Sequence, residues 1–238
     1  MSETNNGRQP HTAMAIYLVR PERVDEVGNR LREHWPLLRE NQLATGTPAV
    51  VYSGQDSHGS FFVEFVEWTD AEATGRAFRT DAISVIWQDL YAYTEARDGR
   101  PAVEYPTVTR LEFPDDHATT TTTDAPSSAY TAMAIYQVRP EKVEAFTDLM
   151  RRNWPALRSA ELVTARPPVV YSGEGDNGPF FVEFVEWVDA DAPSKAFRDE
   201  NVSPIWQDLY AFTEARSGRP AVEYPTVVRQ DWFATQGQ

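Results

Sequence analysis

An internal duplication constrains this chain more than any other feature of its sequence. When the sequence is shifted by 119 positions, TAMAIYLVRPERV at Thr12 aligns with TAMAIYQVRPEKV at Thr131. The alignment continues without a gap to RPAVEYPTVTR and RPAVEYPTVVR, and 62 of the 102 pairs from Thr12 to Phe113 are identical. The 238 residues therefore encode one module twice, and this length suits two ordinary domains.

The composition around the repeats predicts where the modules begin and end. The first module is predicted at residues 12–113 and the second at 131–232. Residues 114–130 are rich in Thr, Ser, Pro and Asp, which bury little apolar surface, so a flexible linker is expected there. A disordered tail is expected at residues 1–11 and a second tail at 233–238.

Both repeats show the same order of strand-like and helix-like patterns. In the first repeat, residues 13–19 form a strand-like run, and residues 22–41 carry apolar side chains at helical spacing, with Pro36 predicting a kink or restart. Strands at 49–53 and 61–68 flank a polar turn, a helical stretch runs to Tyr93, and residues 102–112 form the last strand. The order β-α-β-β-α-β predicts an α+β fold of two ferredoxin-like modules.

Each predicted antiparallel sheet has helices on one face and needs a cover for the other. The matching face of the second module is the expected cover, so the two sheets are predicted to pack face to face as an intrachain pseudo-dimeric α/β barrel. Two physically separate domains are the alternative.

Composition and charge exclude several classes of protein. The formal net charge is −14 and the pI is about 4.7, which repels phosphate backbones, so no nucleic-acid partner is expected. No apolar run approaches the roughly 18 to 20 residues that span a bilayer, and no secretory signal pattern is present, so no membrane partner and a cytoplasmic location are expected. There is no cysteine and no metal- or nucleotide-binding motif, so no metal and no cofactor are expected.

Several motifs resemble the dimeric α/β-barrel superfamily, in particular its antibiotic-biosynthesis-monooxygenase-like branch. They are the strand ending VRPE (Val19–Glu22 and Val138–Glu141) and the strand FFVEFVEW, followed by an acidic, Ala-rich segment (Trp68–Ala73 and Trp187–Ala192). Members usually build the barrel from two chains, so a duplicated chain resembles a fused dimer. The family includes cofactor-independent monooxygenases of aromatic polyketides, cyclases and haem-degrading enzymes. The Ala-His pair that begins the second helix of many members is missing here, which disfavours haem degradation.

The strand FFVEFVEW carries the candidate catalytic groups. Its alternation places four side chains on one face, Phe62, Glu64, Val66 and Trp68. Because an ionised carboxylate beneath the helices would be costly to desolvate, this face is predicted to point into the space between the sheets. Glu64 and its counterpart Glu183 are candidate general acids or bases. The alternative is a structural role in which they pair with arginines of the last strands, Arg110 and Arg229.

Aromatic side chains provide the candidate substrate contacts. Those expected to hold a ligand are Phe62, Trp68 and Tyr105 in the first repeat and Phe181, Trp187 and Tyr224 in the second. The alternative is that the tyrosines only fill space in the core. His34, which is matched by Asn153, is expected to have a surface or capping role, and the aromatic stripe containing Trp87 is expected to be packing.

Together these patterns predict an α/β-barrel protein that binds a hydrophobic or aromatic small molecule. The leading hypothesis, carried by the family resemblance, is a cofactor-independent monooxygenase acting on an aromatic or polyketide-like substrate. One alternative is a non-catalytic binding or stress-associated barrel protein. Another is a cyclase or isomerase that uses the same acid/base carboxylates, and homo-oligomer formation stays open.

Overall fold

The structure, a computed structural model, describes residues 9–56, 58–111, 128–175 and 177–233. Most of the predicted tails (1–11 and 233–238) and linker (114–130) therefore lie outside the described residues. The chain divides into unit 1, Met1–Thr109 with Val228–Gln238, and unit 2, Arg110–Val227. The module boundaries at 12–113 and 131–232 stay a prediction, and the segment from Val228 onward is part of unit 1.

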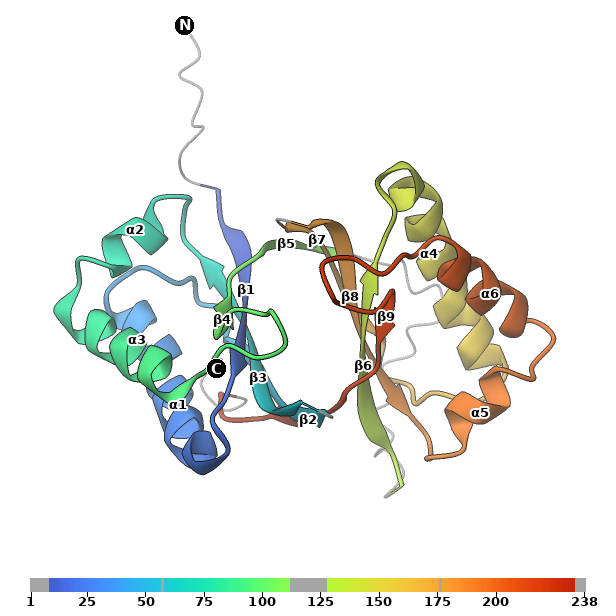
Figure 1. Cartoon of the computed structure of the whole chain (residues 1–238), viewed down its shortest axis with the longest axis horizontal. Coiled ribbons are helices and arrows are strands. Elements are labelled where there is room, and N and C mark those ends of the chain that lie inside the picture. Colours follow the sequence, from blue (N-terminus) through green and yellow to red (C-terminus); the bar gives the residue numbers. More distant parts are fainter. Residues whose placement is uncertain (1–8, 57, 112–127, 176, 234–238) are drawn as a thin grey trace, which may run out of the picture. The chain divides into compact units, whose positions relative to one another are not determined.

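Unit 1 follows the predicted order of elements (Figure 1). They are β1 (His11–Leu18), α1 (Val24–Glu40), β2 (Val50–Asp56), β3 (Gly59–Trp68), α2 (Ala73–Ala77), α3 (Asp81–Tyr93), β4 (Val103–Glu104) and β5 (Thr107–Leu111). Antiparallel pairing gives the order β2-β3-β1, and β4 and β5 both pair with β1. The register sets Ala15 of β1 opposite Glu64 of β3, which positions the candidate site.

Unit 2 repeats this arrangement. Its elements are β6 (Tyr130–Gln137), α4 (Val143–Ser159), β7 (Val169–Gly175), β8 (Gly178–Trp187), α5 (Ala192–Ala196), α6 (Ser203–Ala211), β9 (Val222–Glu223) and β10 (Thr226–Gln230). The pairing order is β7-β8-β6, with β9 and β10 on β6, and Ala134 lies opposite Glu183. The mixed α+β fold and the ferredoxin-like order are confirmed.

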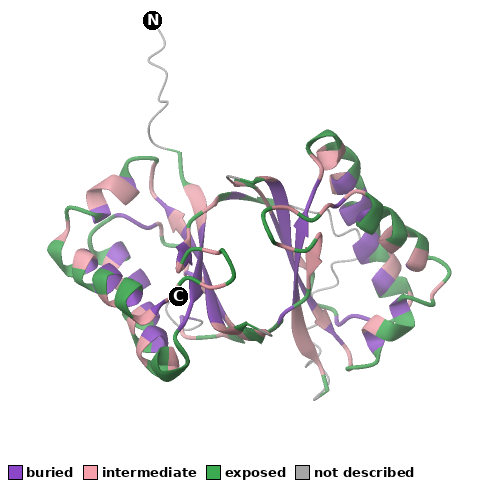
Figure 2. Cartoon of the chain, viewed as in Figure 1, coloured by how far each residue is buried: buried purple, intermediate pink, exposed green. Residues whose placement is uncertain are grey.

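The first helix of each unit buries one apolar stripe on its own sheet. In α1 the buried side chains recur every three or four residues, as a helix with one inward face requires. Pro36 lies inside α1, but the helix continues to Glu40 and does not restart. The backbone hydrogen bond that Pro36 cannot make is offset by burial of its neighbours Trp35 and Leu38. Buried residues accordingly follow the strands and the inner sides of the helices (Figure 2).

The C-terminal segment of the chain completes the core of unit 1. The ring of Phe233 is 4% exposed and lies 5.1 Å from the ring of Trp35, centroid to centroid. Trp232 lies near Phe62, and the guanidinium carbon of Arg32 stands 4.6 Å from the centre of the Trp232 ring. Residues far apart in the sequence therefore share one core.

In the described parts of the chain, no helix combines the length and the apolar character needed to cross a lipid bilayer.

Candidate functional site

The carboxylate of Glu64 faces the helices of unit 1. Phe62, Val66 and Trp68 belong to one core with side chains of α1 and α3, and Glu64 lies on the same face of β3 because successive strand residues alternate between faces. The prediction that this face points away from the helices is therefore wrong. It failed because the argument from desolvation assumed that the helices offer a carboxylate no polar partner, whereas α1 offers His34.

Two side chains from different elements form hydrogen bonds with the carboxylate of Glu64. The Tyr17 hydroxyl of β1 donates to Oε2 at 3.0 Å, and Nδ1 of His34 lies 3.0 Å from Oε1 and 3.1 Å from Oε2. Glu64 is 1% exposed and His34 is 3% exposed. The predicted pairing of Glu64 with Arg110 is wrong, because Tyr17 and His34 occupy the carboxylate instead.

Trp87 determines which nitrogen of His34 carries the proton. Its indole Nε1 donates to Nε2 of His34 at 2.8 Å. A ring nitrogen that accepts a hydrogen bond carries no hydrogen, so the network assigns the proton of the neutral imidazole to Nδ1, which faces Glu64. The hydrogen bonds therefore run in one direction, from Trp87 to His34 and from His34 to Glu64.

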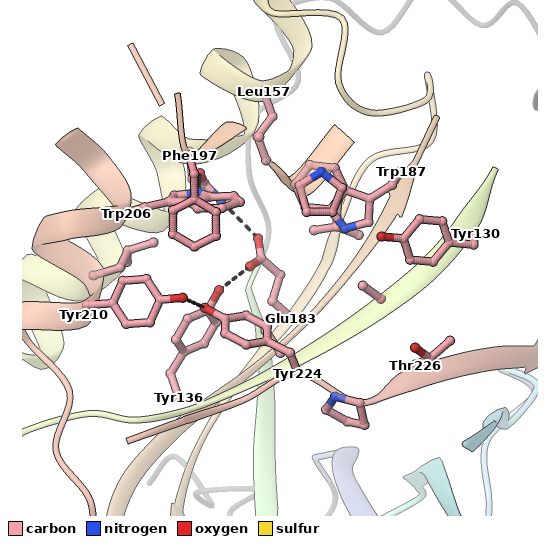
Figure 3. Close-up of a pocket in the computed structure, with 17 residues that line it drawn as sticks. Tyr130, Tyr136, Leu157, Glu183, Trp187, Phe197, Trp206, Tyr210, Tyr224 and Thr226 are labelled. Carbon is pink, nitrogen blue, oxygen red and sulfur yellow. Dashed lines mark hydrogen bonds between the residues drawn. The ribbon is translucent and has the colours of Figure 1, made fainter. Parts of the chain in front are cut away.

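Unit 2 builds the same network with an asparagine. Trp206 Nε1 donates to Oδ1 of Asn153 at 2.9 Å, and Nδ2 of Asn153 donates to Oε1 of Glu183 at 3.4 Å. The Tyr136 hydroxyl donates to Oε2 of Glu183 at 2.8 Å (Figure 3). Asn153 thus preserves the direction of every hydrogen bond, but an amide cannot take up a proton as imidazole can.

The environment of Glu183 disfavours its ionised form. Burial raises the pKa of Glu183 to about 7, although hydrogen bonds from Tyr136 and Asn153 act in the opposite direction. Its partners are both neutral, so the predicted pairing with Arg229 is wrong, and Arg229 pairs with Asp231 at 3.5 Å. Burial also raises the pKa of the Tyr136 hydroxyl, which therefore stays protonated and donates at neutral pH.

Each carboxylate borders a cavity within its own unit. The two cavities have the same volume, about 290 Å³, near the lower end of the range for small-molecule sites. The floor of each is made by small side chains of the first strand, Ala13 and Ala15 in unit 1 and Ala132 and Ala134 in unit 2. The walls are largely aromatic, and half-exposed rings stand at their rims, Phe78, Tyr91 and Tyr105 in unit 1 and Phe197, Tyr210 and Tyr224 in unit 2.

The structure brings most of the predicted site residues to these cavities. Glu64, Trp68 and Tyr105 line the cavity of unit 1, and Glu183, Trp187 and Tyr224 line that of unit 2. Phe62 and Phe181 are not among the lining residues. They pack in the apolar cores of their units, where Phe62 lies close to α1 at Gly28 and Phe181 contacts the ring of Phe146.

The indole nitrogen of Trp68 is a buried donor without an acceptor among the described residues. Its ring lines the same cavity as Glu64, with the start of β1 alongside. A buried N–H group without a partner is energetically unfavourable.

Sequence reasoning missed the role of His34, and the expectation of a surface or capping role is wrong. A signal was present, because Leu31 and Leu38 flank His34 on the apolar stripe of α1 at helical spacing. Trp87 packs in the core as expected, but it also directs the imidazole through its N–H group.

No cluster of three or more His, Cys, Asp or Glu side chains suited to a metal ion occurs among the residues that the structure describes.

Comparison with solved structures identifies the fold. A protein of Fusobacterium nucleatum subsp. nucleatum ATCC 25586, provisionally named a monooxygenase, is 10% identical, with 92% of each chain covered and a TM-score of 0.58. A protein of Lactobacillus acidophilus NCFM with the same provisional name is 9% identical, with 92% of this chain and 93% of that chain covered and a TM-score of 0.55. An anthrone oxidase-like protein is 15% identical, with 97% and 95% covered and a TM-score of 0.55.

These likenesses confirm the predicted α+β fold with its ferredoxin-like order of strands and helices. At such low identities the likeness concerns the fold alone. No protein-family model matches the sequence, and no curated protein matches it.

Proposed function

We propose that unit 1 binds a hydrophobic aromatic molecule beside Glu64 and oxidises it as a cofactor-independent monooxygenase. The observation that carries the proposal is the buried carboxylate of Glu64, hydrogen-bonded by Tyr17 and His34 at the wall of an aromatic cavity. A carboxylate that is held in place and shielded from water can accept a proton from a weakly acidic O–H or C–H group.

The proposed substrate is a flat aromatic compound with a carbonyl group and an acidic methylene or phenol. The alanine floor leaves room for a ring against the sheet, and the aromatic walls favour stacking. Burial raises the pKa of Tyr105, so its hydroxyl stays protonated and can donate to an enolate oxygen.

The proposed reaction converts a CH2 group and O2 into C=O and H2O. Glu64 removes one proton, the carbanion passes one electron to O2, and the radical pair combines to form a C–O bond. Glu64 returns its proton to the resulting peroxide. Loss of the second C–H proton, with cleavage of the O–O bond, gives the ketone and water. Two protons move, and Glu64, held by Tyr17 and His34, carries the first of them out and back.

The use of O2 is supported by the fold, because similar solved structures bear monooxygenase and anthrone oxidase names. A cyclase or isomerase would use the same carboxylate without oxygen. A non-catalytic binding protein would fill the same cavity without turnover.

The test is oxygen consumption by the full chain with a panel of anthrones and related polyphenols. We expect turnover that stops under argon and falls about a hundred-fold or more in E64Q, because a positioned general base contributes about that much. Turnover that continues under argon would favour the cyclase or isomerase. Binding without any turnover would favour the non-catalytic alternative.

E67Q is the matched control for E64Q, because Glu67 lies on the same strand and bonds to Thr45, away from the cavity. We expect E67Q to keep its turnover. Equal losses in E67Q and E64Q would mean that the substitution acts through folding. The variant E183Q separates the units, since a comparable loss there would assign the chemistry to both cavities.

A further inference from the structure

Among the residues that the structure describes, Glu183 is a buried carboxylate without a positive partner. It is 5% exposed, and its hydrogen bonds come from the neutral side chains of Tyr136 and Asn153. In unit 1 the equivalent of Asn153 is His34, an imidazole in place of the amide. The partners of Glu183 are neutral, so a positive charge beside its ionised form would come from outside the network.

The walls around Glu183 are suited to such a charge. The rings of Trp187 and Trp206 stand at 88° to each other with centroids 6.0 Å apart, so they form an aromatic corner. Tyr210 and Tyr224 close another side and are joined by a hydrogen bond of 2.8 Å between their hydroxyls. Figure 3 shows the carboxylate of Glu183 pointing in among these rings. Aromatic faces attract alkylated ammonium groups, most strongly where water is excluded.

We propose that the cavity of unit 2 binds a small organic cation, with a substituted ammonium group lying against Glu183 and the aromatic walls. An alkylammonium group combines the positive charge that the carboxylate lacks with an apolar surface that suits Trp187 and Trp206. The net charge of −14 also draws cations toward the protein. This site goes beyond the oxidation proposed for unit 1, because it uses the other cavity and needs no chemistry.

The test compares two probes of the same shape that differ in charge, choline and 3,3-dimethyl-1-butanol. Isothermal titration calorimetry with the full chain at pH 8 should show choline binding about ten-fold or more tightly than the neutral alcohol. The variant E183Q should lose this preference. Equal binding of the two probes, or a preference for choline that survives in E183Q, would overturn the proposal.

E186Q is the matched control for E183Q. Glu186 lies on the same strand and bonds to Thr164 rather than lining the cavity, so its replacement removes one charge and leaves the site intact. The preference for choline should persist in E186Q. Its loss in both variants would show that general charge, and not Glu183, attracts the probe.

The unmodified protein gives a second test that does not depend on how a variant folds. The preference for choline should grow between about pH 5 and pH 8 as Glu183 ionises, because its pKa is raised to about 7. The other titratable groups at this cavity are tyrosines, Tyr130, Tyr136, Tyr210 and Tyr224. Burial raises the pKa of Tyr130, Tyr136 and Tyr224 above the ordinary value, so these three stay neutral over this range. A preference that is constant over this range would count against Glu183 as the group that binds the cation.

Discussion

The two units hold equivalent carboxylates in equivalent networks, and they differ at the one position that can carry a proton. In both, a tryptophan on the last helix donates to a residue of the first helix, which donates to the glutamate. That residue is His34 in unit 1 and Asn153 in unit 2. Since either side chain satisfies the network, structure alone does not require a histidine. The difference is an imidazole in unit 1 and an amide in unit 2.

The largest expected effect concerns the core and not the network. Phe233 is buried against Trp35 in the core of unit 1. We expect F233A to lower the free energy of unfolding by about 3 to 5 kcal/mol, as for other buried phenylalanines. Urea denaturation measures this loss. V228A is the control, because Val228 lies in the same segment but is largely exposed, and it should change stability by no more than about 0.5 kcal/mol.

The second prediction tests whether the neutral surroundings of Glu183 destabilise its ionised form. Its pKa is raised from 4.5 to about 7, so its contribution to stability is complete below pH 4.5 and is lost as the pH rises through about 7. Relative to E183Q, the unmodified protein should lose about 3 kcal/mol of unfolding free energy between about pH 4 and pH 8. Urea denaturation across this range measures the slope. Parallel pH profiles for the two proteins would show that Glu183 is not desolvated as described.

The third prediction makes unit 1 resemble unit 2. H34N should preserve the fold, because Asn153 shows that an amide can join Trp87 and Glu64 in the same way. If oxidation in unit 1 uses the imidazole to position Glu64, kcat should fall about 10- to 100-fold and KM should change little. Steady-state oxygen consumption provides both readouts.

The reciprocal variant N153H serves as the comparison for H34N. It should lower the pKa of Glu183 from about 7, because an imidazole can ionise beside the carboxylate. Carbon NMR of the carboxyl group follows this change. Unchanged turnover in H34N together with an unchanged Glu183 titration in N153H would reduce the histidine to a structural substitute for asparagine.

The smallest expected effect concerns the tryptophans. W87F removes the N–H group that His34 accepts, and W206F does the same to Asn153. Each should cost about 1 to 2 kcal/mol of unfolding free energy, since a buried acceptor is left unsatisfied. W87F should also raise the population of His34 with a proton on Nε2, which nitrogen NMR detects. Identical NMR spectra of His34 before and after the substitution would contradict the role given to Trp87.

Much of the fold followed from local patterns. The repeat predicted two similar units, and the spacing of Leu31, Trp35 and Leu38 predicted α1 with its buried face. The return of the segment from Val228 to unit 1 could not be predicted, because it depends on packing between residues about 200 positions apart, such as Phe233 and Trp35.

The orientation of the site was harder to predict than its residues. Because side chains alternate along a strand, the sequence shows which side chains of β3 share a face. Both faces of this strand are apolar and buried, so the sequence pattern could not show which face lies under the helices. Glu64 was identified as a candidate, but its partner His34 was missed because a lone polar residue on an apolar stripe does not reveal what it faces.

The place of Phe233, after the whole of unit 2 in the sequence, has a consequence during protein synthesis. Unit 2 is one uninterrupted stretch, Arg110–Val227, whereas unit 1 needs residues that the ribosome adds after that stretch. Domains generally fold in the order in which they emerge. Here the repeat that is translated first keeps an open apolar surface at Trp35 until Phe233 has been added, so unit 2 can complete its core before unit 1 does.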